Sequence, residues 1–166
     1  MPTAYLLLGS NLGNRATILQ EAVLHLTAFI GPVVAASSLY ETAAWGLEDQ
    51  PAFLNQALAL HTTLTPGHVL AACQAAEQQA GRERLVRWGA RTLDVDILLY
   101  DDLVLATPTL HIPHPRLPER RFALEPLAEI AADVMHPALG HSIASLLRIC
   151  PDPLPVSRVS GPSKTK

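Results

Sequence analysis

Several features that would assign this 166-residue chain to a special class are missing. It has only two cysteines, Cys73 and Cys150, far apart and in no CxxC pair, so we expect reduced thiols rather than a disulfide framework. A net charge of -3 offers no basic surface for nucleic acid. No stretch is long enough to cross a bilayer, and the N-terminus lacks the basic region of a signal peptide. These absences favour a cytoplasmic protein that binds neither a membrane nor nucleic acid.

The composition that remains is typical of a globular domain. Apolar residues make up 49% of the chain, enough to bury a core at this length. We expect a single domain over residues 1–150, working as a monomer. From Pro151 the chain is rich in proline and serine and has a basic end, which predicts a disordered tail over 151–166.

Periodicity and capping signals define the order of elements. Strands are expected over 3–10, 33–42, 53–62 and within 91–100, with a short hairpin strand near 103–106. Helices are expected over 15–30, where Asn14 can cap, over 66–80, where Thr65 caps and Pro66 begins the helix, and over 119–131 and 142–149, although Pro126 should break or kink the third of these. The order predicts an α+β fold, a ferredoxin-like βαββαβ sandwich with an additional hairpin strand and C-terminal helices. The helices would cover one face of the sheet and leave the other partly open.

The run RTLDVDILLY, residues 91–100, places two acids in a strand, where aspartate is disfavoured. Asp94 and Asp96 project from one face, with Cα atoms roughly 6.6 Å apart. Two carboxylates this close repel each other unless a proton or a cation intervenes. A Mg²⁺ ion, which proteins hold with carboxylates and substrate phosphates, would relieve this repulsion. The alternative is that both acids are solvated at an exposed sheet edge.

The loop before this strand is rich in arginine. Four arginines stand at positions 82, 84, 87 and 91, against a single Glu83. An ion-pair cluster is one explanation, but exposed ion pairs contribute only about 0–1 kcal/mol each. A metal-bound polyphosphate explains both signs of charge, because guanidinium groups bind phosphate oxygens. There is no Walker A or GxGxxG sequence, and GSNLGN has the wrong spacing for either.

Residues 87–98, RWGARTLDVDIL, resemble the signature of the 6-hydroxymethyl-7,8-dihydropterin pyrophosphokinase family. Further agreement comes in the same order from YLLLGSN (5–11), DQPAFLN (49–55), residues 81–82, 112–114 and 120–122, and Pro126-Leu127, over nearly the whole chain to about residue 150. The resemblance implies transfer of a pyrophosphoryl group from ATP, the co-substrate, to the pterin hydroxymethyl oxygen, releasing AMP. It also implies a ferredoxin-like fold and two Mg²⁺ ions.

The same resemblance implies roles for individual residues. Asp94 and Asp96 would bind the metal ions and, with Arg82 and Arg91, form the catalytic set. ATP would contact Leu70, Gln74, Glu77, Arg82, Arg84, Arg87, Trp88, Arg91, Ile97, His111, His114 and Arg120. The pterin would contact Thr42, Ala43, Trp45, Phe53, Asn55 and Phe122. The family's frequent proline is replaced here by Ala43-Ala44, an aliphatic position by Trp45 and a hydroxyl residue by His111, whereas Arg121 has no counterpart with a clear role.

Each assignment has a plainer alternative. Trp88, Phe53 and Phe122 could be core residues, and the 70, 74 and 77 positions fit an amphipathic helix boundary equally well. The HxxH spacing of His111 and His114 could suggest zinc, but no third ligand clusters with them in the sequence. At the level of function, the rivals are a non-catalytic RNA- or ligand-binding module and a metal-dependent phosphohydrolase.

Overall fold

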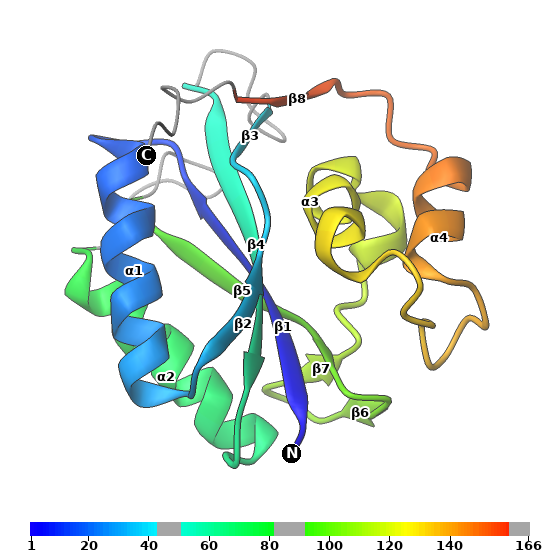
Figure 1. The fold of residues 1–166 in the computed structure, drawn as a ribbon, viewed down its shortest axis with the longest axis horizontal. Helices are drawn as coiled ribbons and strands as arrows, with labels where there is room; N and C mark the ends of the chain where they lie inside the picture. Colours follow the sequence, from blue (N-terminus) through cyan, green and yellow to red (C-terminus); the bar gives the residue numbers. More distant parts are fainter. Residues whose placement is uncertain (43–50, 82–91, 160–166) are drawn as a thin grey trace.

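The computed structural model describes residues 1–42, 51–81 and 92–159. One antiparallel sheet runs through the centre, with helices on both of its faces (Figure 1). Its strands are β1 (Thr3–Ser10), β2 (Val33–Ala36), β3 (Tyr40–Thr42), β4 (Phe53–His61), β5 (Asp94–Tyr100) and β8 (Val156–Arg158). They lie in the order β5-β1-β4-β3-β8, and β2 also pairs with β4.

The helices are α1 (Arg15–Phe29), α2 (Pro66–Gln79), α3 (Arg121–Ala131) and α4 (Ile143–Ile149), with a 3-10 turn at Leu117–Glu119. The predicted caps are confirmed: the Asn14 side chain accepts a hydrogen bond from the Thr17 N–H, and Thr65 from the His68 N–H, with Pro66 at the first position of α2. Gly31 ends α1 with φ 153°, and a Cβ there would stand 1.9 Å from the carbonyl oxygen of His61. The missing side chain therefore lets the chain pass close to the end of β4 as it turns from α1 into β2.

Two clusters of buried residues lie on opposite faces of the sheet, because side chains alternate along each strand. The cluster under α1 and α2 includes Leu6, Leu8, Leu58, Val95 and Ile97. The cluster under α3 and α4 includes the residues Leu7, Leu98, Leu99, Leu124, Leu127 and Leu146. Helices α1 and α2 cover the first face, as expected, and α3 and α4 pack over part of the second face, which was expected to be partly open (Figure 1).

Other expectations also differ from the structure. The strand predicted over 33–42 is divided into β2 and β3, and the Ser37 side chain at the break accepts the Ala57 N–H and replaces a strand-to-strand partner. The hairpin strand near 103–106 is β6 (Leu105–Ala106), which pairs with β7 (His111–Ile112) in a separate two-stranded sheet. Of the two outcomes expected at Pro126, a break or a kink, the break does not occur, because helix α3 continues through this residue.

The prediction of a disordered tail from residue 151 is wrong for residues 151–159. This segment contains β8, which pairs antiparallel with β3 at the edge of the main sheet. The composition of this segment did not predict the pairing, because a strand of three residues is too short to show a clear alternation of apolar and polar residues. Residues 160–166 lie outside the described residues.

Both cysteines are buried and free, in agreement with the expectation of reduced thiols. Burial raises the pKa of Cys73 to about 12, with a further contribution from Glu77 and Asp96, so this thiol is un-ionised and unreactive. Among the residues described, no helix combines the length and apolar character needed to cross a membrane.

Candidate active site

The site is built on the sheet face that α3 and α4 only partly cover. Strand register aligns Asp94 of β5 with Gly9 of β1, Gly9 with Asn55 of β4, and Asn55 with Tyr40 of β3. Residues that stand opposite one another across adjacent strands point to the same face. Asp94 and Asn55 are two strands apart, so their Cα atoms are separated by roughly 10 Å. A carboxylate and an amide are thus placed at opposite ends of a span the size of a small heterocycle and its substituent.

The second aspartate lies one step further along the same face. Asp96 is opposite Leu7, on the α3 side of the sheet, whereas Val95 and Ile97 point into the core beneath α1 and α2. Asp94 and Asp96 are half-buried and both take part in polar interactions. Their placement on one face confirms the geometric expectation from the sequence.

Asn55 and Thr42 form the polar wall at the other end. Both are buried, and Asn55 Nδ2 donates a hydrogen bond to Thr42 Oγ1 over 3.2 Å. This bond fixes the amide plane, and the amide also carries a carbonyl oxygen and a second N–H, the groups that a heterocycle edge would require. Phe53 is opposite Thr42 and half-buried, which places an aromatic ring beside the amide.

Gly9 is a site residue that the sequence reasoning missed. A Cβ at this position would stand 2.6 Å from Asn55 Oδ1 and 3.5 Å from Phe53 Cδ1. The absence of a side chain therefore leaves room for both groups on the sheet floor. Gly9 lies in the GSN sequence at the end of β1, and its neighbours in the sequence give no sign that it packs against Asn55.

Arg120 and Phe122 flank the first residue of α3. The guanidinium carbon of Arg120 lies 5.5 Å from the centre of the Phe122 ring, within the range of a cation–π contact. Burial lowers the pKa of Arg120, opposed by the charges of Asp96 and Asp94, and its Nε has no hydrogen-bond partner within the described part of the chain. The arginine remains charged, so a half-buried cation is held near the two carboxylates.

His114 follows β7 and is tied to the sheet through its N–H, which donates to the carbonyl oxygen of Leu98 over 3.0 Å. Its Nδ1 accepts the Arg116 N–H at 3.1 Å, so the neutral ring carries its proton on Nε2. Burial lowers the pKa of His114, with Arg120 and Arg116 acting in the same direction and Asp96 against it. The ring is therefore neutral near pH 7 and can donate one hydrogen bond. His111 on β7 is exposed.

Glu77 lies on α2 and contacts the strand that carries the two aspartates. Its Oε2 accepts the N–H of Val95 over 2.8 Å, and Val95 stands between the two aspartates. This carboxylate therefore anchors the start of β5 to α2. Leu70 packs against the core on the same helix, and Gln74 is exposed.

The structure does not bring every expected residue to the aspartate face. The Ile97 side chain is buried on the opposite face, and Leu70 and Gln74 belong to α2 on that side too. The expected residues Ala43, Trp45, Arg82, Arg84, Arg87, Trp88 and Arg91 lie outside the described residues. Over 1–42, 51–81 and 92–159, no group of three or more histidine, cysteine or acidic residues is arranged to hold a metal ion.

Antiparallel sheet and flanking helices define the chain as a mixed α/β protein with its polar site on one sheet face. The family model for 7,8-dihydro-6-hydroxymethylpterin-pyrophosphokinase (HPPK) matches residues 5–132, and the chain belongs to this family.

Individual relatives agree. A 2-amino-4-hydroxy-6-hydroxymethyldihydropteridine pyrophosphokinase of Bacillus subtilis is 49% identical over 133 residues, 79% of either chain. One from Methylorubrum extorquens is 47% identical over 136 residues, 81% of this chain and 86% of its own. Among solved structures, wild-type Plasmodium falciparum HPPK-DHPS matches with a TM-score of 0.70 at 16% identity, over 89% of this chain. This chain spans 44% of that larger protein, and at this identity the match shows the fold alone.

Proposed function

We propose that the protein transfers pyrophosphate from ATP to 6-hydroxymethyl-7,8-dihydropterin, giving AMP and the pterin diphosphate, a step of folate biosynthesis. One observation carries the proposal: the row that aligns Asp94, Gly9 and Asn55 across three strands. It puts groups suited to a metal-bound phosphate and to a pterin edge on one surface. All of these residues lie within the range matched by the family.

The pterin would lie at the Asn55 end of this row. Besides the N–H donated to Thr42, the Asn55 amide carries an acceptor and a second donor suited to the heterocycle edge, and Phe53 and Phe122 supply ring faces from the sheet and from α3. Stacking between two aromatic rings combines dispersion with exclusion of water. Ala43 and Trp45, which by resemblance belong to the same wall, stay predictions.

Asp94 and Asp96 fit the requirements of Mg²⁺. They are half-buried, on one face, and without a third acidic residue in a cluster among the described residues. Mg²⁺ is commonly held by one or two carboxylates together with substrate phosphates and water, so this sparse set is appropriate. Bound metal would neutralise phosphate charge; we propose two ions, as the family resemblance implies.

The side chains near the aspartates would position and stabilise the phosphates. Arg120 supplies a fixed positive charge, and neutral His114 can donate from Nε2. Reaction then needs the pterin oxygen aligned with the β-phosphorus, without a covalent enzyme intermediate. Arg82, Arg84, Arg87, Trp88 and Arg91 would complete the phosphate contacts.

The nucleotide would cross the edge of the sheet. Strand β5 is the edge strand next to β1, with the aspartates on one face and α2 behind the other. A ligand that contacts Asp96 and also Leu70, Gln74 or the Ile97 backbone must therefore pass around β5. This arrangement reconciles the aspartate site with ATP contacts on the opposite face.

We also propose that the core of the fold is ferredoxin-like. If β2 and β3 are taken as one interrupted strand, the order β5-β1-β4-β2/β3 with two crossing helices has the expected βαββαβ pattern. Strands β6 and β7, helices α3 and α4, and β8 are additions to it. The monomeric state and cytoplasmic location stay predictions, the former to be checked by analytical ultracentrifugation.

The test is incubation of the protein with ATP, Mg²⁺ and 6-hydroxymethyl-7,8-dihydropterin, followed by mass spectrometry. We expect AMP and pterin diphosphate in equal amounts, with no product when EDTA is present. Inorganic phosphate without AMP would instead indicate a phosphohydrolase. Tight RNA retention without Mg²⁺ and without turnover would indicate a binding module.

A further inference from the structure

The segment from Cys150 to Val159, here called the C-terminal strap, connects α4 to the far edge of the sheet. It runs across the end of α3 to β8 (Figure 1). The family match ends at residue 132, so membership of the family leaves the function of the strap open. Its contacts involve the two elements that carry the pterin-facing residues.

The first attachment joins the strap to the beginning of α3. Asp152 is 4% exposed, and its Oδ2 accepts the Arg121 N–H over 3.1 Å while its Oδ1 accepts the Leu154 N–H over 3.0 Å. In return, the Arg121 side chain donates from Nε to the carbonyl oxygen of Asp152 and from Nη2 to that of Cys150, each over 3.1 Å. Arg121 stands between Arg120 and Phe122, so these bonds hold the part of α3 that faces the site.

The second attachment joins the strap to β3. Val156 is opposite Thr42 and Arg158 is opposite Tyr40, and the Val159 N–H donates to the carbonyl oxygen of Leu39 over 2.8 Å. Thr42 is the partner of Asn55 in the polar wall. The strap therefore covers the strand edge directly behind that wall.

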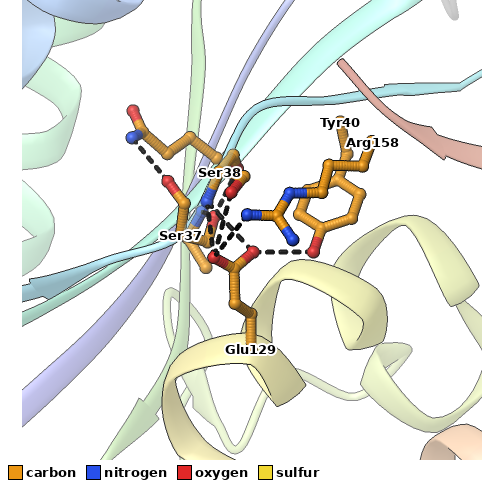
Figure 2. Close-up of polar contacts among 7 residues, drawn as sticks. Ser37, Ser38, Tyr40, Glu129 and Arg158 are labelled. Carbon is orange, nitrogen blue, oxygen red and sulfur yellow. Dashed lines mark hydrogen bonds and ion pairs between the residues drawn. The ribbon is translucent and has the colours of Figure 1, made fainter. Parts of the chain in front are cut away.

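A third link joins α3 to β3 between these attachments. Figure 2 shows Glu129 of α3 accepting hydrogen bonds from the Ser38 N–H and hydroxyl and from the Tyr40 hydroxyl, the last over 2.7 Å. Arg158 of the strap lies 3.9 Å from the same carboxylate. Burial alone would raise the pKa of Glu129, but these hydrogen bonds outweigh it and the net shift is downward, so the group is a carboxylate at neutral pH.

We propose that the C-terminal strap sets the separation between Phe122 on α3 and the Thr42–Asn55 wall on the sheet, which makes Arg121 and Asp152 positioning residues for the pterin. The inference rests on the proposed function. A stacking slot loses affinity when its walls move by a fraction of an ångström, whereas the long Arg120 side chain can follow its phosphate. The strap acts on the rigid end of the site, so it affects the pterin more than ATP.

The test is steady-state kinetics of Asp152→Ala and Arg121→Ala, assayed well below their melting temperatures. We expect the KM for the pterin to rise about tenfold, with kcat and the KM for ATP within about twofold of wild type. Asp152→Asn, which keeps one acceptor oxygen, should recover part of the loss. Asp102→Ala and Arg148→Ala change exposed residues of the same types and should leave both KM values unchanged.

A second pair of variants tests the other attachment. Ser157 is opposite Glu41 in the β3–β8 pair, so Ser157→Pro removes a backbone donor from this strand, whereas Ser157→Ala retains it. Ser157→Pro should raise the KM for the pterin but not the KM for ATP. This variant keeps the proposal testable even if Asp152→Ala fails to fold. Folded variants with unchanged pterin KM, or with equal increases for ATP and pterin, would overturn the role of the strap. An inactive wild-type protein would instead overturn the proposed function.

Discussion

The two faces of the central sheet come from the same strands but have opposite characters. Toward α1 and α2, β1, β4 and β5 present Leu6, Leu58 and Ile97, all at most 5% exposed. Toward α3 the alternate positions present Gly9, Asn55 and Asp96 at the same end of the strands. One face therefore stabilises the fold through apolar burial, and the other gives up part of that burial to place polar groups. The comparison teaches that stability and chemistry are separated here by strand alternation alone.

The strongest test of this separation is removal of an acid from the polar face. Asp96→Ala and Asp94→Ala should each lower Mg²⁺-dependent AMP formation by about 10³-fold, because phosphate charge loses its metal ligand. Melting temperature should change little, because relief of the repulsion between the two acids is offset by the polar interactions that each of them loses. Asp102→Ala is the matched control on an exposed turn. Full turnover by either site variant would contradict the metal assignment.

The converse test removes an apolar side chain from the other face. Leu58 is fully buried, so Leu58→Ala should lower the free energy of unfolding by about 2–5 kcal/mol, measured by urea denaturation. Turnover of the folded fraction should stay within about twofold of wild type, because no site group moves directly. The exposed Leu24 gives the control, with Leu24→Ala expected to cost less than about 0.5 kcal/mol. A loss of turnover in folded Leu58→Ala would show that the faces are not separable.

An intermediate effect is expected where the polar face needs empty space. Gly9→Ala places a methyl group 2.6 Å from Asn55 Oδ1, so the amide must move. The KM for the pterin should rise about tenfold, with a stability cost of about 1–3 kcal/mol from overpacking. At Gly67 nothing lies within 4 Å of an added Cβ, so Gly67→Ala should leave both quantities near wild type. Unchanged pterin affinity in Gly9→Ala would show that the Asn55 amide does not read the ligand.

Glu77 of α2 hydrogen-bonds to β5 and so connects the helices on the apolar face to the strand that carries the two aspartates. Glu77→Gln keeps an acceptor for the Val95 N–H but removes its charge, which weakens the hydrogen bond by about 1 kcal/mol. We expect kcat to fall about fivefold, because a looser Val95 displaces Asp94 and Asp96 on either side of it. The Kd for ATP should be less affected. Glu21→Gln, at an exposed position of α1, is the control. A large rise in the ATP Kd with normal kcat would instead support the direct nucleotide contact that the family resemblance implies.

The smallest effect concerns the pH dependence of stability and involves His136, between α3 and α4 on the polar side of the sheet. Burial lowers the pKa of His136, whose Nδ1 accepts the N–H groups of Ala138 and Leu139. Below about pH 6.5 the unfolded chain therefore binds a proton at this histidine more readily than the folded chain does. The contribution of His136 to the free energy of unfolding is present above that pH and declines below it.

One proton bounds the slope at about 1.4 kcal/mol per pH unit. Urea denaturation between pH 7 and 5 should show a smaller slope for His136→Gln than for wild type. The exposed His141 provides His141→Gln as the control. An unchanged slope for His136→Gln would remove the histidine from this role.

Much of this arrangement could be predicted because its signals are local. The caps at Asn14 and Thr65 and the alternation around Asp94 and Asp96 depend on neighbouring residues, and the structure places them as expected. The contributions of Gly9, Glu77 and Asp152 could not be predicted, because each acts on a partner far away in the sequence. The tail gave a misleading signal, since three residues of β8 gain their stability from β3 rather than from their own pattern.

By itself, the sequence determined which residues carry charge, which carry rings, and which side of a strand each occupies, because alternation follows from backbone geometry. Only the tertiary structure decided that β5, β1 and β4 lie side by side in a register that aligns Asp94 with Asn55. It also decided that α3 and the C-terminal strap close over the same face. Such pairings depend on packing between distant segments, and their free energy exists only once those segments meet.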